Sequence, residues 1–261
     1  MTNEEILQIA MAQSAIDLSC HPADFKKTTP VISVSQPHPK ARKYLTLPQV
    51  CDLCSYGNNV VAAVAPELEN EIAGYLARYD AVHCFETPHL HALSAILRPH
   101  GYDVCFQAEY FLPDPELLHT LPCPYPVKFL TQKDFTNLYL PQWSNALCKA
   151  RKQLDILGAG AYAQDQLIGL AGASADCDTM WQIGIDVLPT FRRNGIAAAL
   201  ISTLAIEILS RGIVPFYCRA WSNLASGRSA IRSGFRPAFV HVTAKPLAQI
   251  AQMNDEATPT C

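Results

Sequence analysis

The sequence predicts an α/β protein in two parts, and three observations support this prediction. Short apolar runs typical of buried strands alternate with segments whose apolar residues recur at helical spacing. Of the 261 residues, 49% are hydrophobic and 16% are charged, so the chain can bury a sizeable core. Five prolines lie between Phe111 and Val127, where they remove backbone donors and fix φ. We therefore predict an accessory α/β domain over residues 1–120, a second domain over 121–246 and a tail over 247–261.

In the first domain, predicted helices and strands alternate along the chain. Apolar residues recur at helical spacing over residues 4–18, whereas residues 20–46 show no clear period. Pro66 stands at the first position of a second helix, where proline is favoured. The remaining predictions are strands at 59–65, 82–85 and 102–111 and a helix at 88–97.

The second domain has clearer signals. Short helices are expected at 134–138 and 143–152, and a hairpin around Gln164-Asp165 joins strands at 156–163 and 166–174. A strand at 181–187 precedes a long helix from 194 to 210, which ends at Arg211-Gly212 as helices prefer. A strand at 214–220, a helix at 223–233 and a strand at 238–244 follow, and the tail from residue 247 is expected to be mobile.

The composition argues against several classes of protein. Twenty basic and 23 acidic residues give a formal net charge of −3, which disfavours bulk binding to nucleic acid or to an anionic membrane. Glu4 and Glu5 stand where a signal peptide needs positive charge, and the longest nearly apolar stretch, 195–209, is shorter than the roughly 20 residues of a membrane span. We expect a cytoplasmic protein with neither nucleic acid nor membrane as partner, whose ten cysteines are reduced.

The most informative segment is WQIGIDVLPTFRRNGIA, residues 181–197. A predicted strand ends at Val187, a tight loop follows, and an apolar helix that must be buried against a sheet begins near Gly195. The first amides of a helix lack intrahelical partners and lie at the positive end of its dipole, so they bind anions. Gly195 lets an anion approach the backbone, and Arg192 and Arg193 add charge suited to phosphate. The alternative is an ordinary helix N-terminus with two solvated arginines.

This pattern, Arg-x-x-Gly-x-Ala after a strand ending in Val-x-Pro, resembles the acyl-CoA pyrophosphate loop of the GNAT N-acetyltransferase superfamily. Asn223 after the next strand and Gly234-Phe235 after the next helix agree with that family. The resemblance implies a GNAT fold in the second domain, acetyl-CoA or another acyl-CoA as co-substrate, and no metal. It implies that the cofactor is bound by Ile185, Asp186, Val187, Arg192, Arg193, Asn194, Gly195, Ile196, Ala197, Asn223 and Ser226.

Two positions depart from the family pattern. The family usually carries a tyrosine near the cofactor sulfur that protonates the departing thiolate, and this position holds Ala230. The strand before the loop lacks the glutamate or histidine that serves some members as a base. Because an amine of pKa about 10 must lose a proton before it attacks, we name Asp186 and Glu109 as candidate catalytic bases. Asp186 has an alternative role as the cap of the turn at 190–193. Candidate substitutes for the missing acid are Tyr217, Cys218 and Ser222.

A second pattern is weaker. Cys51 and Cys54 form half of a zinc motif that nearby histidines would complete. Because the sequence has no second Cys-x-x-Cys, ordinary buried thiols are the favoured interpretation.

These patterns together predict an N-acyltransferase that transfers acetyl from acetyl-CoA to the amine of a small molecule by direct attack. The segment at 140–145, with Trp143 and Trp181, is expected to line the acceptor pocket, and the first domain to shape it. That layout resembles two-part GNAT proteins. The alternatives are a GNAT-fold module that binds acyl-CoA without turnover, and a protein N-acetyltransferase. The oligomeric state stays open, with a homodimer as one alternative.

Overall fold

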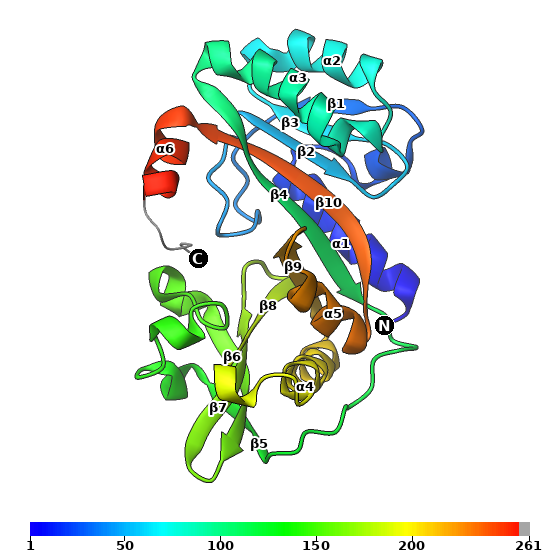
Figure 1. Ribbon diagram of the computed structural model, residues 1–261. Coiled ribbons are helices and arrows are strands. Elements are labelled where there is room, and N and C mark those ends of the chain that lie inside the picture. The colour runs from blue at the N-terminus through cyan, green and yellow to red at the C-terminus, as the bar shows by residue number, and fades with distance from the viewer. Residues whose placement is uncertain (256–261) are drawn as a thin grey trace. The chain divides into compact units, whose positions relative to one another are not determined.

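The computed structural model describes residues 1–255 (Figure 1). The chain forms two compact units: the first comprises Met1–Ala10 and Phe111–Pro237, and the second comprises Met11–Tyr110 and the described residues from Ala238 on. The structure therefore divides the chain at other points than the predicted 1–120 and 121–246. The elements that run from one unit into the other are α1 (Asn3–Asp17), β4 (Tyr102–Pro113) and β10 (Phe235–Pro246).

In the first unit, strands lie in the order β9-β8-β7-β6-β5. Neighbouring strands are antiparallel except β8 and β9, which are parallel. A parallel pair needs a crossover connection, and helix α4 provides it. The strands are β5 (Val127–Thr131), β6 (Asp155–Ala163), β7 (Gln166–Ser174), β8 (Met180–Val187) and β9 (Val214–Ala220).

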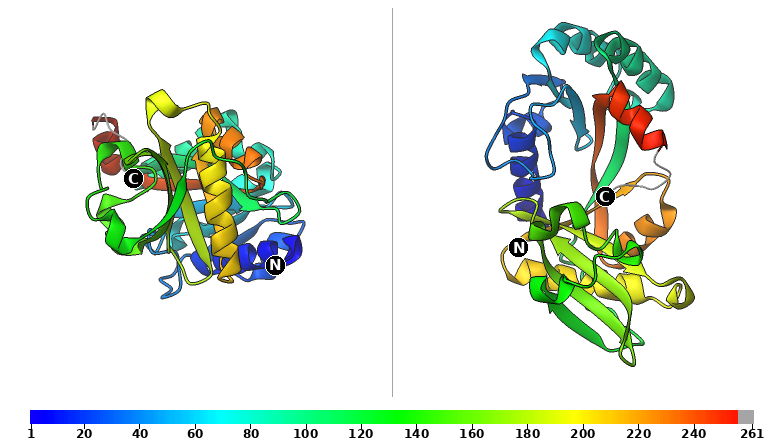
Figure 2. Two further views of the ribbon diagram at one scale, coloured as in Figure 1. Left: turned by 90° about the horizontal axis from the view of Figure 1, so that it is seen from below. Right: turned by 90° about the vertical axis from the view of Figure 1, so that its left-hand side faces the viewer.

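Helix α4 (Ile196–Ser210) lies along one face of this sheet, as the left panel of Figure 2 shows. Ile196 and Leu200 of the helix belong to the same buried core as Ile183 of β8. The prediction that this apolar helix is buried against a sheet is confirmed. Helix α5 (Leu224–Arg232) follows β9 and packs against α4.

The other face of the sheet is covered by the segment between β5 and β6. Gly169 faces α4, so the next residue of β7, Leu170, points to the opposite face. There Leu170 packs with Trp143 and Leu147 in a second core cluster. The short helices that the sequence predicted at 134–138 and 143–152 are 3₁₀ helices with somewhat different bounds. They are η5 (Gln132–Phe135), η6 (Pro141–Trp143) and η7 (Lys149–Leu154).

In the second unit, the strand order is β1-β3-β2-β10-β4. β1 and β3 are parallel, and β2 is antiparallel to both β3 and β10. Helices α2 and α3 bury Ile72 and Leu93 in the same core as Leu53 of β2. The bounds are β1 (Val31–Val34), β2 (Cys51–Ser55), β3 (Val61–Val64), α2 (Glu69–Arg78) and α3 (Thr87–Leu97).

The α/β class predicted from the sequence is confirmed, and some elements differ. The predicted strand at 82–85 is wrong: Asp80 accepts the backbone N–H groups of Val82 and His83 at 3.0 and 2.9 Å, which favours the 3₁₀ turn η3 (His83–Phe85). The predicted tail begins with helix α6 (Leu247–Asp255), and the rest of the tail lies outside the described residues.

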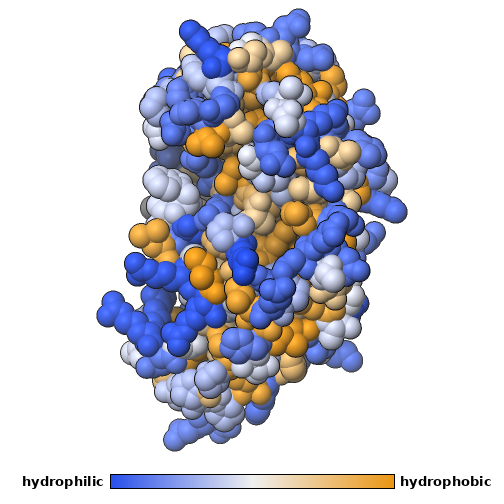
Figure 3. Space-filling view, turned by 90° about the vertical axis from the view of Figure 1, so that its right-hand side faces the viewer, coloured by the Kyte–Doolittle hydropathy of each residue, from blue (hydrophilic) through white to orange (hydrophobic). Residues whose placement is uncertain are grey.

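The surface carries both polar and apolar side chains. Hydrophilic and hydrophobic residues alternate over the face in Figure 3, as on most globular proteins. Within residues 1–255, no helix has the length and apolar character needed to cross a bilayer.

Candidate functional site

Strands β8 and β9 pair along only part of their length. Their paired residues end at Gln182 and Phe216, although β8 continues to Val187 and β9 to Ala220. On its other edge β8 stays paired with β7 as far as Val187. The last residues of β8, with Ile185, Asp186 and Val187 among them, therefore have no β9 partner in the described chain. Their backbone edge toward β9 carries no strand of the described residues, and apart from the Val187 carbonyl, which accepts from Nε of Arg192, it is open to an extended ligand.

Helix α4 begins beside the end of this strand. Gly195 precedes the helix with φ of 77°, in the left-handed region that glycine adopts readily, and no side chain caps the helix. The first intrahelical bond runs from the N–H of Ala199 to the carbonyl of Gly195 at 3.1 Å. The N–H groups of Ile196 and Ala197 precede that bond, so they are placed to bind an anion.

Three arginines lie around this helix start. Arg192 donates from Nε to the carbonyl of Val187 at 2.9 Å, so its side chain closes the loop onto the end of β8. Arg193 is exposed, and its φ of 67° places it in the left-handed region. The third arginine, Arg232, was not named in the sequence analysis. It lies near Gly195, because a Cβ added to that glycine would be 3.8 Å from Nη2 of Arg232. Asn194, also in this loop, donates to the carbonyl of Phe191 at 3.3 Å.

The predicted cofactor residues after β9 have partners within the chain. Asn223 caps α5, and its side chain accepts the N–H of Ser226 at 3.1 Å. The hydroxyl of Ser226 lies 2.7 Å from that of Tyr217. Tyr217 follows the last residue of β9 that pairs with β8, and burial raises the pKa of its phenol. Ala230 is fully buried on α5 and brings no polar group to this region.

Asp186 is held by the segment that covers its face of the sheet. Its Oδ2 accepts the backbone N–H groups of Asn145 and Ala146 at 2.8 and 2.9 Å, and its Oδ1 accepts from the Asn145 side chain at 2.7 Å. Burial raises the pKa of this carboxyl, and these hydrogen bonds act in the opposite direction. The hydrogen bonds of the Asp186 carboxylate thus hold residues 145–146, and from the turn at 190–193 the charge of Arg192 also lowers its pKa.

Two glycines beneath the same segment were also missed by the sequence analysis. A Cβ added to Gly184 would lie 1.8 Å from the carbonyl oxygen of Asn145, and one added to Gly172 would lie 1.9 Å from that of Ala146. Gly172 and Gly184 are paired across β7 and β8. A glycine inside a strand often marks a close backbone approach, and this signal was available in the sequence.

The second predicted base, Glu109, lies on β4 in the second unit, whereas Asp186 lies in the first. The catalytic role of both carboxylates stays a prediction. Cys51 and Cys54 lie in β2, where strand alternation points residues three apart to opposite faces, and burial raises the pKa of both thiols. Among residues 1–255, no group of three or more His, Cys, Asp or Glu side chains is placed to hold a metal ion.

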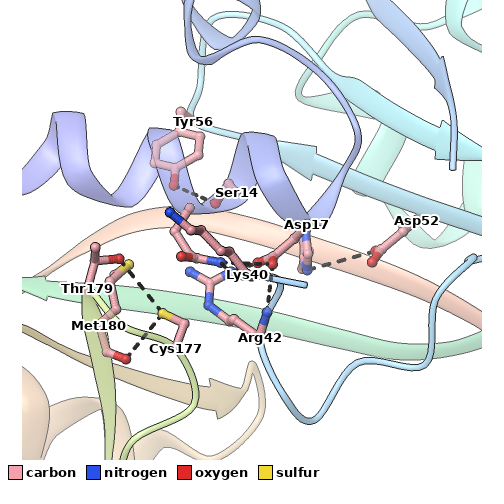
Figure 4. Close-up of polar contacts among 11 residues, drawn as sticks. Ser14, Asp17, Lys40, Arg42, Asp52, Tyr56, Cys177, Thr179 and Met180 are labelled. Atoms are coloured by element: carbon pink, nitrogen blue, oxygen red, sulfur yellow. Dashed lines mark hydrogen bonds and ion pairs between the residues drawn. The ribbon is translucent and has the colours of Figure 1, made fainter. Parts of the chain in front are cut away.

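Figure 4 shows a separate set of buried polar residues, which belongs to the second unit. Arg42 and Asp17 form an ion pair with side chains only 2% and 1% exposed. The N–H of Arg42 also donates to Asp17 at 2.9 Å, and the hydroxyls of Ser14 and Tyr56 lie 2.9 Å apart. The contacts of Arg42 tie the loop before β2 to the end of α1, and that of Tyr56 ties the residue after β2 to the same helix. In the first unit, the same view shows Cys177 donating from Sγ to the carbonyl of Met180 at 3.3 Å.

Comparison with known proteins agrees with the geometry of the first unit. The model of the acetyltransferase (GNAT) family matches residues 116–235, so this part of the chain is a GNAT acetyltransferase domain. Acetyl-CoA is the co-substrate of that family. No curated protein matches the chain.

Solved structures that match parts of this chain include GNAT acetyltransferases. A putative acetyltransferase of this family from Novosphingobium aromaticivorans is 18% identical over 55% of this chain and 66% of its own, with a TM-score of 0.45. A GCN5-related N-acetyltransferase from Sphaerobacter thermophilus is 14% identical over 78% of this chain and 82% of its own, with a TM-score of 0.46. A conserved protein of unknown function from Staphylococcus epidermidis is 16% identical over 81% and 94%, with a TM-score of 0.47.

Proposed function

We propose that this protein transfers an acetyl group from acetyl-CoA to the amine of a small molecule. In this reaction the amine nitrogen attacks the thioester carbonyl carbon, and a C–N bond forms as the C–S bond breaks. The nitrogen gives up a proton to a base, and the leaving thiolate accepts a proton from an acid or from water. The free edge of β8 would bind the extended arm of the cofactor, and the start of α4 its pyrophosphate.

One observation carries this proposal most directly. Helix α4 begins after Gly195, which has a left-handed backbone conformation, and no side chain caps the helix. This helix start lies near the end of β8, where the strand no longer pairs with β9. A substrate with a pyrophosphate at one end and an extended amide-containing arm fits both features. The three arginines near this helix start supply charges that suit phosphate oxygens.

The test combines binding with turnover. Isothermal titration with CoA should give saturable binding, and acetyl-CoA with a panel of small amines should release free thiol above a blank without protein. Binding that is lost with pantetheine, which lacks the pyrophosphate and the nucleotide of CoA, would support the assignment of the α4 site. If the protein neither binds CoA nor releases thiol across a broad panel, the proposal is wrong.

A second candidate is a module that binds acyl-CoA without turning it over. Two observations favour it: Ala230 cannot protonate the thiolate, and the hydrogen bonds of the Asp186 carboxylate are made with residues 145–146. Saturable CoA binding with no thiol release, also at pH 9 where amines are less protonated, would support this candidate. Thiol release that depends on one amine would exclude it.

A further inference from the structure

We propose that Asp186 is a positioning residue, which fixes residues 145–146 beside the free edge of β8 as one wall of the acceptor site. The second half of this proposal, that the segment is a wall of the acceptor site, rests on the acetyltransferase function proposed above. Its first half, the fixing of the segment, stands on the contacts alone.

Three hydrogen bonds join the Asp186 carboxylate to residues 145–146. Three donors from two consecutive residues, at 2.7 to 2.9 Å, surround one half-buried carboxylate. Two of these donors are backbone N–H groups, so the bonds fix the main chain and not merely a side chain. Hydrogen bonds to a charged acceptor are the strong kind. Asp186 therefore determines where this part of the segment lies.

The packing below the segment points to the same role. Gly172 and Gly184 sit side by side on β7 and β8 with Asn145 and Ala146 directly above them, so close that no Cβ fits at either position. Gly184 and Asp186 are two residues apart on one strand and so face the same side. The glycines allow the main chain of the segment to approach the sheet, and Asp186 holds it there.

The place of the segment connects it to the reaction. Asp186 lies on the part of β8 that lacks a β9 partner, and its side chain reaches the segment on the face opposite α4. Ser144 and Asn145 are exposed there, whereas Trp143, Ala146 and Leu147 are buried and anchor the segment. One residue thus sets the distance between the strand edge proposed for the cofactor and the exposed residues 144–145. An amine acceptor that reaches this edge contacts those residues.

The first experiment needs no substrate. Hydrogen–deuterium exchange, read by mass spectrometry, is compared in peptides that contain residues 145–146 and in peptides from the start of α4. In Asp186→Asn we expect the amides of Asn145 and Ala146 to exchange roughly tenfold faster or more, because a hydrogen bond to a charge is lost. The α4 peptides should not change. Asp178→Asn is the matched control: this exposed aspartate lies just before β8 and should leave both regions unchanged.

A second variant reaches the segment without altering a titratable group. Gly184→Ala keeps Asp186 but places a methyl group where the Asn145 carbonyl lies. It should accelerate exchange at the same amides, and CoA binding checks that the variant is folded. Unchanged exchange at residues 145–146 in Asp186→Asn would overturn the positioning role. This outcome does not depend on which substrate the protein acetylates.

Kinetics then separate positioning from proton transfer. If Asp186 positions the segment, Asp186→Asn and Gly184→Ala both raise KM for the amine, while kcat at saturating amine stays within about threefold. If Asp186 is the base, Asp186→Asn lowers kcat by roughly 10²–10⁴-fold and Gly184→Ala does not. That second pattern would overturn the proposal. Absence of turnover in the unaltered protein would instead count against the proposed function, and the exchange result would still decide whether Asp186 fixes the segment.

Discussion

Gly184 of β8 lies directly beneath the main chain of Asn145, with room for a hydrogen atom but not for a methyl group. In Gly184→Ala the new methyl group would therefore clash with backbone atoms, which cannot move aside as a flexible side chain can. We expect it to lower the free energy of unfolding by about 1–3 kcal/mol. Urea denaturation measures this change.

The matched control is a glycine in open space. Gly74 lies inside helix α2, and a Cβ added there meets no atom within 4 Å. Gly74→Ala should therefore stabilise the protein by about 0.5–1 kcal/mol, because alanine is the better helix former. If Gly184→Ala proved as harmless as Gly74→Ala, the segment at 145–146 would not be held against the sheet as described.

The second prediction concerns the phosphate site at the start of α4. Alanine at position 195 would need the left-handed conformation, which costs about 1–2 kcal/mol, so the helix start should change shape in Gly195→Ala. We expect the Kd for CoA to rise roughly tenfold, since about 1.4 kcal/mol corresponds to a factor of ten. Isothermal titration calorimetry measures it.

Gly212 offers a closely matched control for that experiment. It follows the other end of α4 with φ of 78°, and an added Cβ there would have no neighbour within 4 Å, whereas one at Gly195 would lie 3.8 Å from Nη2 of Arg232. Gly212→Ala carries the same backbone strain and should lose similar stability, while its affinity for CoA stays within about twofold. Equal losses of affinity in both variants would mean that strain, and not the anion site, is being measured.

A third prediction concerns the pH dependence of stability, which Asp52 and His241 of the second unit influence in opposite directions. Burial raises the pKa of Asp52 from 3.8 to about 8, so between these values the native state holds a proton that the unfolded chain has lost. Its contribution to stability falls as the pH rises. Burial lowers the pKa of His241 from 6.5 to about 3, and its contribution falls as the pH drops below 6.5.

The two contributions overlap and largely cancel between about pH 4 and 6.5, and above pH 6.5 only that of Asp52 changes. Asp52→Asn keeps an oxygen that can accept the Thr243 hydroxyl but cannot ionise. Between pH 6.5 and 8, we expect the free energy of unfolding of the variant to rise relative to that of the unaltered protein by up to about 1.4 kcal/mol per pH unit, measured by urea denaturation. A stability difference independent of pH would contradict the raised pKa. Glu67→Gln, at an exposed carboxyl of the second unit, is the control that should show no such gain.

Much of the first unit could be predicted from the sequence because its signals are local. Short apolar runs and the turn at Gln164-Asp165 located β6 to β9, and the glycine at 195 together with the apolar run after it located α4 and the anion site. In contrast, β1 and β2 lie in stretches with little periodicity, and their strand structure comes from pairing with β3 and β10. Such pairing depends on residues far apart in the sequence.

The same distinction applies to the candidate site. The sequence indicated that Asp186 shares a strand face with Gly184, and from that alone a catalytic role and a capping role were both open. The donors that surround it come from residues 40 and 41 positions earlier, which no local pattern reveals. The division into units was equally hidden, since β10 begins in one unit and continues in the other.

The last prediction concerns the proton that the leaving thiolate takes up. Ala230 has no group to give one, whereas the phenol of Tyr217 lies on β9 where its pairing with β8 has ended, and its raised pKa keeps it protonated at neutral pH. If this phenol is the acid, Tyr217→Phe lowers kcat for thiol release by roughly 10²-fold. Ser226→Ala removes the hydroxyl's partner but keeps the phenol, so its kcat should fall far less. Because a thiol of pKa about 8.5 is already a tolerable leaving group, full activity in Tyr217→Phe would mean that the thiolate departs without an acid.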